Sequence, residues 1–163
     1  AKRTPEALAQ VESALRSKWE GVQSIALRVL GAWGDEESIH RLRSFLEDTL
    51  VRDRFWTPRS AAIEELARCI KARDASWVLD HLFSLNCSLM KHEFLTVVLA
   101  LPPEAARDRL VTERLSTNRD NRQAAMKAIG NMVFPDRKEL LTPFLQDQDE
   151  LIRKVAKILH ARS

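Results

Sequence analysis

The sequence predicts an all-α protein in which helix pairs repeat and stack into a solenoid. The first indication is a phrase that occurs twice: VQSIALRVLG at residues 22–31 returns as NRQAAMKAIG at residues 121–130, and each copy is followed at the same distance by a Phe-Leu-x-Asp run that ends at Asp48 or Asp147. The second is spacing, because apolar residues recur every three or four positions and give each helix one stripe to bury. The third is composition, since 45% hydrophobic and 30% charged residues with only four glycines are typical of a helical protein.

The register of the repeated phrase gives the order of the elements. Residues 58–67 match its first helix, with Ala62 over Ala26, and a last match begins at Asp149. The third copy is weaker, because the apolar run that ends at Leu101 is followed at once by two prolines, which break a helix. We expect ten helices, at residues 5–16, 19–32, 36–51, 57–72, 75–86, 90–101, 103–116, 119–133, 136–146 and 149–161.

Residues at the expected helix ends agree with this division. Proline suits the first turn of a helix, where Pro5, Pro58 and Pro103 lie. We expect Gly31 and Gly130 at helix ends, because glycine tolerates the positive φ of that position. Carboxylates that can cap a helix start are found at Asp35, Asp74, Asp136 and Asp149.

Two stretches resemble a known repeat. The pattern V-x-x-x-A-x-x-x-L-G-x-x-G-D at residues 22–35 and the pattern D-x-D-E-x-I-R-x-x-A at residues 147–156 are similar to HEAT repeats, in particular to the short bacterial kind found in phycobilin-lyase-type proteins. The resemblance extends over nearly the whole chain and is weakest in the third copy. It implies a right-handed α-α superhelix of the HEAT/armadillo type, with four to five helix pairs whose second helices line a concave face. The usual role in this family is to bind a protein without catalysis, and a minority of members bind DNA.

Length and cysteine usage indicate the class of protein. A chain of 163 residues fits one domain, residues 1–163, which could also be a fragment of a longer chain. Cys69 and Cys87 lie in apolar helical stretches and are expected to be reduced, which favours a cytoplasmic location. The most apolar run, residues 94–101, is too short to cross a bilayer, so no membrane association is expected.

The charge pattern bears on possible partners. The net charge is +3, and residues 1–82 carry 13 basic and 13 acidic residues whereas residues 83–163 carry 13 and 10. Dedicated nucleic-acid binders have a denser basic face. A nucleic-acid-binding module that uses arginines and lysines of the C-terminal half stays an alternative function, although cations near a helix C-terminus also favour its dipole. Its basic residues would be Arg119, Arg122, Lys127, Arg153, Lys154, Lys157, His160 and Arg162.

One connection is longer than its counterpart. Asp147 to Ile152 spans five positions, but the equivalent stretch from Asp48 to Pro58 spans ten. Insertions in solenoids often serve binding, and arginine and aromatic residues dominate interface hot spots. The alternative is that the aromatic residues fill the gap between two repeats. The resulting hypothesis is a partner-binding edge formed by Trp19, Arg52, Arg54, Phe55, Trp56 and Arg59.

Arginines on the second helices form another candidate surface. Arg41, Arg107 and Arg114 are expected on the concave side, where they would suit a phosphate or a carboxylate. Acidic residues lie between them at helical spacing and can pair with them instead, which would leave a solvated and neutral face.

Catalytic and metal-binding motifs are not evident. His81, Cys87 and His92 form a loose cluster without the paired spacing of a zinc site. A phosphate-binding glycine loop and a nucleophile elbow are absent from the sequence. We therefore expect a non-catalytic scaffold that binds a protein or a peptide and needs no cofactor or metal, with its oligomeric state left open.

Overall fold

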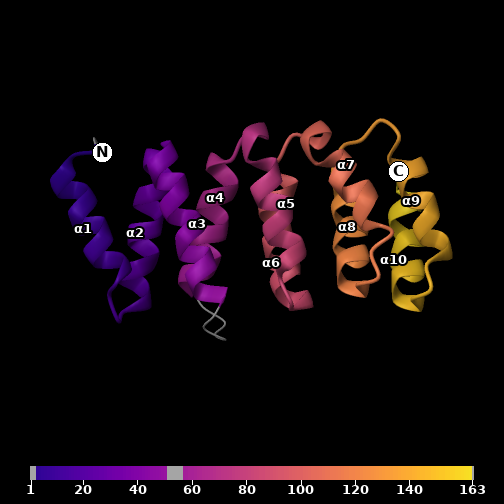
Figure 1. The fold of residues 1–163 in the computed structure, drawn as a ribbon, viewed down its shortest axis with the longest axis horizontal. Coiled ribbons are helices and arrows are strands. Elements are labelled where there is room, and N and C mark those ends of the chain that lie inside the picture. The colour runs from indigo at the N-terminus through magenta and orange to yellow at the C-terminus, as the bar shows by residue number, and fades with distance from the viewer. Residues whose placement is uncertain (1–2, 51–56, 163) are drawn as a thin grey trace. The chain divides into compact units, whose positions relative to one another are not determined.

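The computed structural model describes the backbone of residues 3–50 and 57–162, and the side chains of these residues except at positions 49 and 50 (Figure 1). Over these residues it contains ten α-helices, two short 3₁₀ helices and no strand, which confirms the all-α fold. The chain divides into two compact units, residues 1–70 and residues 71–163, which are described separately. The prediction of a single domain and that of a right-handed superhelix with a concave face stay predictions.

Unit 1 contains α1 (Pro5–Leu15), α2 (Glu20–Trp33), α3 (Glu36–Leu50) and α4 (Thr57–Cys69). Helix α2 is central, since it packs against each of the other three. The apolar residues at the predicted spacing form the core. Its most deeply buried members are Ala26, Leu27, Leu30, Leu42, Leu46, Ala62 and Leu66.

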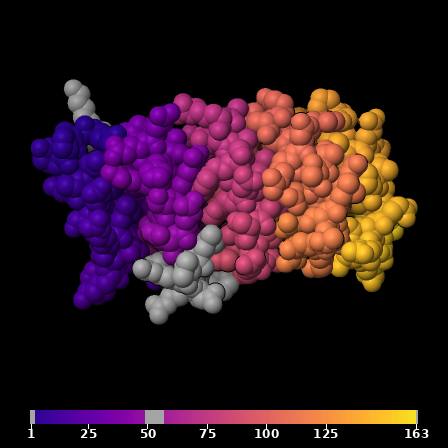
Figure 2. Space-filling model, viewed as in Figure 1, coloured from indigo at the N-terminus to yellow at the C-terminus, as the bar shows by residue number. Residues whose placement is uncertain are grey.

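Unit 2 begins with the 3₁₀ helix η1 (Ala72–Asp74). It continues through α5 (Ala75–Ser84), α6 (Ser88–Leu99), α7 (Pro103–Glu113), α8 (Arg119–Asn131), α9 (Arg137–Leu141), the 3₁₀ helix η2 (Thr142–Gln146) and α10 (Glu150–Ala161). Helix α8 packs against α6, α7, α9 and α10. In the space-filling view, side chains close the gaps between the orange α8 and the yellow α10 (Figure 2). We call α2, α4, α6, α8 and α10 the first helices of their pairs.

The expected helix at residues 136–146 is divided. Helix α9 ends at Leu141, and the chain goes on as the 3₁₀ helix η2. Pro143 explains the change, because its ring nitrogen carries no hydrogen for the α-helical ladder and its ring crowds the preceding turn. The pairing of α9 and η2 with α10 is otherwise as the repeat predicts.

The two glycines of the repeated phrase do not end their helices. Gly31 and Gly130 lie inside α2 and α8, and the positive φ of 61° that ends α2 belongs to Gly34. The expectation was wrong because the glycines serve helix packing. A β carbon added at position 31 would stand 2.6 Å from Cβ of Glu65 on α4, and one at position 130 would stand 2.5 Å from Cδ1 of Leu159 on α10.

Two of the four expected acidic caps are present. Asp35 Oδ1 accepts the amide of Ser38 at 2.8 Å, and Asp149 Oδ1 accepts the amide of Ile152 at 3.1 Å. Asp136 instead forms an ion pair with Arg107 on α7. The remaining one, Asp74, accepts the amide of Lys71 and not one of α5. The prolines expected in first turns lie there, at the starts of α1, α4 and α7.

Candidate functional site

The first helices of three pairs are held by the same hydrogen bond. A side chain in the first turn donates to a backbone carbonyl in the loop that leads into the helix. Arg122 and Arg153 occupy the repeat position of Gln23, so the bond follows the register of the phrase. Gln23 donates to the carbonyl of Ser17 at 2.8 Å, Arg122 to that of Ser116 at 3.1 Å, and Arg153 to that of Asp147 at 2.6 Å.

Arg59 occupies this same repeat position on α4 and is buried. Sequence reasoning placed it on a partner-binding edge, but a buried guanidinium offers little surface to a partner. Its register position is that of Arg122, which donates to the carbonyls of Ser116 and Thr117 in the loop before α8. The other arginines and aromatics of that expected edge, Arg52, Arg54, Phe55 and Trp56, lie outside the described residues.

Trp19 is the member of the expected edge that the structure places at the surface. Its side chain is 66% exposed at the N-cap of α2, and Nζ of Lys18 lies 5.5 Å from the ring centroid. At the equivalent N-caps, the side chains of Asn118 and Asp149 accept amide hydrogens of their own helices, whereas Trp19 makes no such bond. An exposed indole therefore stands where a capping residue would stabilise the helix.

Three further apolar residues follow Trp19 along α2 at helical spacing. Val22 is 40% exposed, Ile25 is 62% exposed and Val29 is partly exposed. Single exposed apolar residues are ordinary on a protein surface, but four at i, i+3, i+6 and i+10 from one another form a continuous row. We call Trp19, Val22, Ile25 and Val29 the α2 stripe.

The positions that match Ile25 and Val29 of the α2 stripe are buried on α8 and on α4. On α8 they are Ala124 and Ala128, which are fully buried, and Ala124 lies against α6. On α4 the matching residues Ala61 and Glu65 are buried beside α2. The α2 stripe thus lies on the side of α2 that corresponds to the side of α4 packed against α2 and to the side of α8 packed against α6.

A charged groove lies next to the stripe, between α2 and α4. It has a volume of about 360 Å³, and its floor is Gly31. Glu65, whose side chain is 6% exposed, accepts from Nη1 of Arg68 at 2.8 Å along α4, and the Arg68 side chain is 69% exposed. Its counterpart in unit 2 is the apolar Leu159, so unit 1 holds a buried carboxylate where unit 2 holds an aliphatic contact.

The arginines expected on a concave face are engaged locally. Arg41 forms ion pairs with Glu12 at 2.7 Å and Glu37 at 2.8 Å, and Arg107 pairs with Asp136. Arg114, which ends α7, is partly buried. For Arg41 and Arg107 the structure agrees with the self-neutralised alternative that the acidic residues suggested.

Three basic residues of the C-terminal half, Arg119, Arg122 and Lys154, also form ion pairs. Arg122 and Asp147 form a two-pronged ion pair at 2.8 and 3.0 Å with both side chains 6% exposed, and this bond lowers the pKa of the Asp147 carboxyl. Arg119 donates to Asp149 at 2.7 Å and lowers the pKa of that carboxyl in the same way. Nζ of Lys154 lies 2.7 Å from Glu150.

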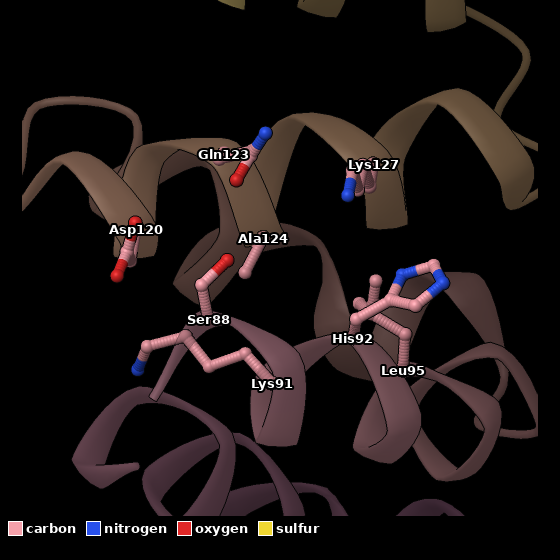
Figure 3. Close-up of a pocket in the computed structure, with 8 residues that line it drawn as sticks. All are labelled: Ser88, Lys91, His92, Leu95, Asp120, Gln123, Ala124 and Lys127. Atoms are coloured by element: carbon pink, nitrogen blue, oxygen red, sulfur yellow. The ribbon is translucent and has the colours of Figure 1, made fainter. Parts of the chain in front are cut away.

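Unit 2 has a small cavity between α6 and α8 (Figure 3). His92 on α6 points toward Lys127 on α8, while Lys91 extends to the other side (Figure 3). Nζ of Lys91 donates to the carbonyls of Leu82 at 2.9 Å and Phe83 at 3.2 Å, and burial lowers its pKa. With a volume of about 10 Å³, the cavity has room for one water at most.

In the described part of the chain, no group of three or more histidine, cysteine or acidic side chains is arranged to hold a metal ion. Within residues 3–50 and 57–162, none of the helices combines the length and the apolar character that crossing a bilayer requires.

Comparison with known proteins agrees with the geometry of unit 1. Residues 22–48, which cover most of α2 and α3, match the family model of the PBS lyase HEAT-like repeat. The chain carries a HEAT-like repeat. The match begins at Val22, so three residues of the α2 stripe lie in the matched segment and Trp19 precedes it. No curated protein matches the chain.

Sequence reasoning found Trp19 but missed the rest of the stripe. The spacing of Val22 and Ile25 is also that of apolar residues on the buried side of a helix, so the pattern alone does not set them apart from core residues. The signal that could have shown them is the register of the HEAT-like repeat. It places Val22, Ile25 and Val29 over Asn121, Ala124 and Ala128, so residues in unit 2 that are small or polar correspond to large apolar ones in unit 1.

Proposed function

We propose that this chain is a non-catalytic scaffold that binds a protein through the α2 stripe. The observation that carries the proposal is the row from Trp19 to Val29, which is exposed or partly exposed, whereas the residues that match Ile25 and Val29 are buried on α4 and α8. Exposed apolar rows of this kind mark interaction sites, and tryptophan is enriched among the residues that dominate interfaces.

The nature of the HEAT-like repeat supports this choice. A stack of packed helices presents side chains from a fixed backbone, so a partner binds without ordering the scaffold first. Nucleic-acid binding is less well supported. Arg119, Arg122 and Lys154 of the C-terminal half already pair with carboxylates, and a phosphate would have to displace those partners.

The test is capture of partners from the native lysate by wild type and by an Ile25→Asp variant. Ile25 is exposed, so the variant is expected to stay folded, which circular dichroism checks. The control is Val133→Asp, because Val133 is 81% exposed, belongs to unit 2 and is not a member of the α2 stripe. The proposal predicts proteins that are retained by wild type and the control, lost with Ile25→Asp, and unaffected by nuclease or by moderate salt. Retention that nuclease abolishes would favour the nucleic-acid alternative.

A further inference from the structure

The packing of first helices in this chain specifies what fits the α2 stripe. In unit 1, α4 lies beside α2, and in unit 2, α10 lies beside α8 and α8 beside α6. In these pairs the matching positions face another helix and not a loop. The stripe is therefore shaped for a helix, because its residues recur at three and four positions along one side of α2.

The pairs α2–α4 and α8–α10 also show which residue the earlier helix presents to the later helix at one position. The residue that matches Val29 is Glu65 on α4 and Leu159 on α10. Glu65 lies on Gly31 of α2, and Leu159 lies on Gly130 of α8. A helix that covers α2 in this manner places a glycine or another small residue over Val29, since a larger side chain would hold the two helices apart.

Charge around the stripe adds a second requirement. Arg16, Lys18 and Arg28 are exposed within residues 16–29, the segment that contains the stripe, and Glu20 is the one acidic residue of this segment. An interface core that is apolar and a rim of opposite charge give specific association. The rim here is mainly basic, so the matching surface is acidic.

We propose that the occupant of the α2 stripe is one amphipathic α-helix of a partner protein. Its apolar side carries a small residue opposite Val29, and its flanks are acidic. This inference rests on the proposed function and adds to it the form and charge of the partner. The helix takes the place that a preceding first helix has in the other pairs, so Ile25 and Val22 become buried as Ala124 is buried in unit 2.

The probe is a synthetic peptide with the sequence of residues 118–132, held helical by a staple on its outward side. This sequence contains α8, the helix whose Gly130 receives Leu159. In one version the flanking positions are glutamate, and in a second they are lysine. A third version has glutamate flanks and the change Gly130→Leu. Binding to the full chain is measured by calorimetry for wild type, Ile25→Asp and the control Val133→Asp.

The inference predicts that wild type and the control bind the glutamate-flanked peptide equally and that Ile25→Asp does not bind it. The lysine-flanked peptide and the Gly130→Leu peptide are expected to bind at least about tenfold more weakly. Failure of the glutamate-flanked peptide to bind, or equal binding of all three peptides, overturns the inference.

Two other occupants are separated by further outcomes. Sedimentation of wild type and of Ile25→Asp over a range of concentrations detects a second copy of this chain; self-association that the variant abolishes would replace the partner helix by that copy. If lysate capture is lost with Ile25→Asp but no helical peptide binds, the stripe still binds a protein, and only the inference of a helical, acidic partner fails.

Discussion

Gly31 of α2 lies directly beneath Glu65 of α4, and a β carbon at position 31 would stand 2.6 Å from Cβ of Glu65. The same relationship joins Gly130 and Leu159 in unit 2. Glycine in the middle of a helix is unfavourable by about 1 kcal/mol relative to alanine. The repeated glycine is therefore explained by the close approach of neighbouring first helices, which offsets that cost.

The effect of an alanine substitution on the free energy of unfolding should depend on the space around each of three glycines. Gly31→Ala is expected to lower the free energy of unfolding by about 1–3 kcal/mol, because Cβ of Glu65 is fixed to the backbone and cannot move aside. Gly130→Ala should cost less, since the nearest atoms belong to the flexible end of Leu159. Gly21→Ala meets nothing within 4 Å and should be neutral or stabilising by up to about 1 kcal/mol. Urea unfolding measures all three, and an equal loss at Gly21 and Gly31 would contradict the packing account.

Glu65 packs on Gly31 in unit 1, and Leu159 packs on Gly130 in unit 2. Exchanging these two residue types tests how a carboxylate and an aliphatic side chain differ in their contribution to stability. Glu65→Leu replaces a buried carboxylate by the residue that unit 2 has, and should raise the free energy of unfolding by about 1 kcal/mol. The reciprocal change Leu159→Glu should lower it by about 2 kcal/mol, because an acid is placed against the backbone of α8. Both are measured by urea unfolding, and a large loss of stability with Glu65→Leu would show that the carboxylate has an essential partner.

The ion pair between Arg122 and Asp147 should be important for the stability of unit 2. Arg122→Ala is expected to cost about 3–5 kcal/mol, because it leaves the Asp147 carboxylate buried without its partner and frees the carbonyl of Ser116. Arg122→Gln should cost less, since Gln23 holds the equivalent loop in unit 1. Thermal unfolding compares the two variants, and equal losses would mean that the hydrogen bond to the loop contributes little.

The ion pair between Arg122 and Asp147 should also make the free energy of unfolding depend on pH. Hydrogen bonding from Arg122 lowers the pKa of Asp147 in the folded state below its ordinary value of 3.8. A lowered folded pKa means that this contribution is complete above pH 3.8 and is lost as the pH falls through the folded pKa. Asp147→Asn should therefore flatten the decline of stability in acid. An unchanged acid-unfolding profile in this variant would exclude Asp147 as a source of that decline.

The sequence predicted helices well because each helix carries its own periodic stripe. Helix α2 and helix α10 begin and end within two residues of their expected positions. The role of Gly31 was missed because it depends on α4, a helix that follows later in the chain. The break at Thr142 was missed because it depends on the geometry of the single residue Pro143.

The candidate site was only partly predictable for a related reason. Periodicity shows that Val22 and Ile25 lie on an apolar side of a helix, but it does not show whether another helix covers that side. Arg59 is buried, and arginine is common both at interfaces and as a buried donor to backbone carbonyls. The comparison with Arg122 in the register separates the two roles.

Trp19 offers the most direct test of the proposed function. Trp19→Asn installs the residue that caps α8 and should stabilise the chain by about 0.5–1 kcal/mol, since the asparagine side chain can accept amide hydrogens of α2. The same change removes the exposed indole from the α2 stripe, so partner capture from the lysate should fall. A protein that is more stable but retains less partner is the result that the account predicts. A variant that retains its partners as wild type does would contradict a role of Trp19 in binding, and with it the assignment of the α2 stripe as the contact surface.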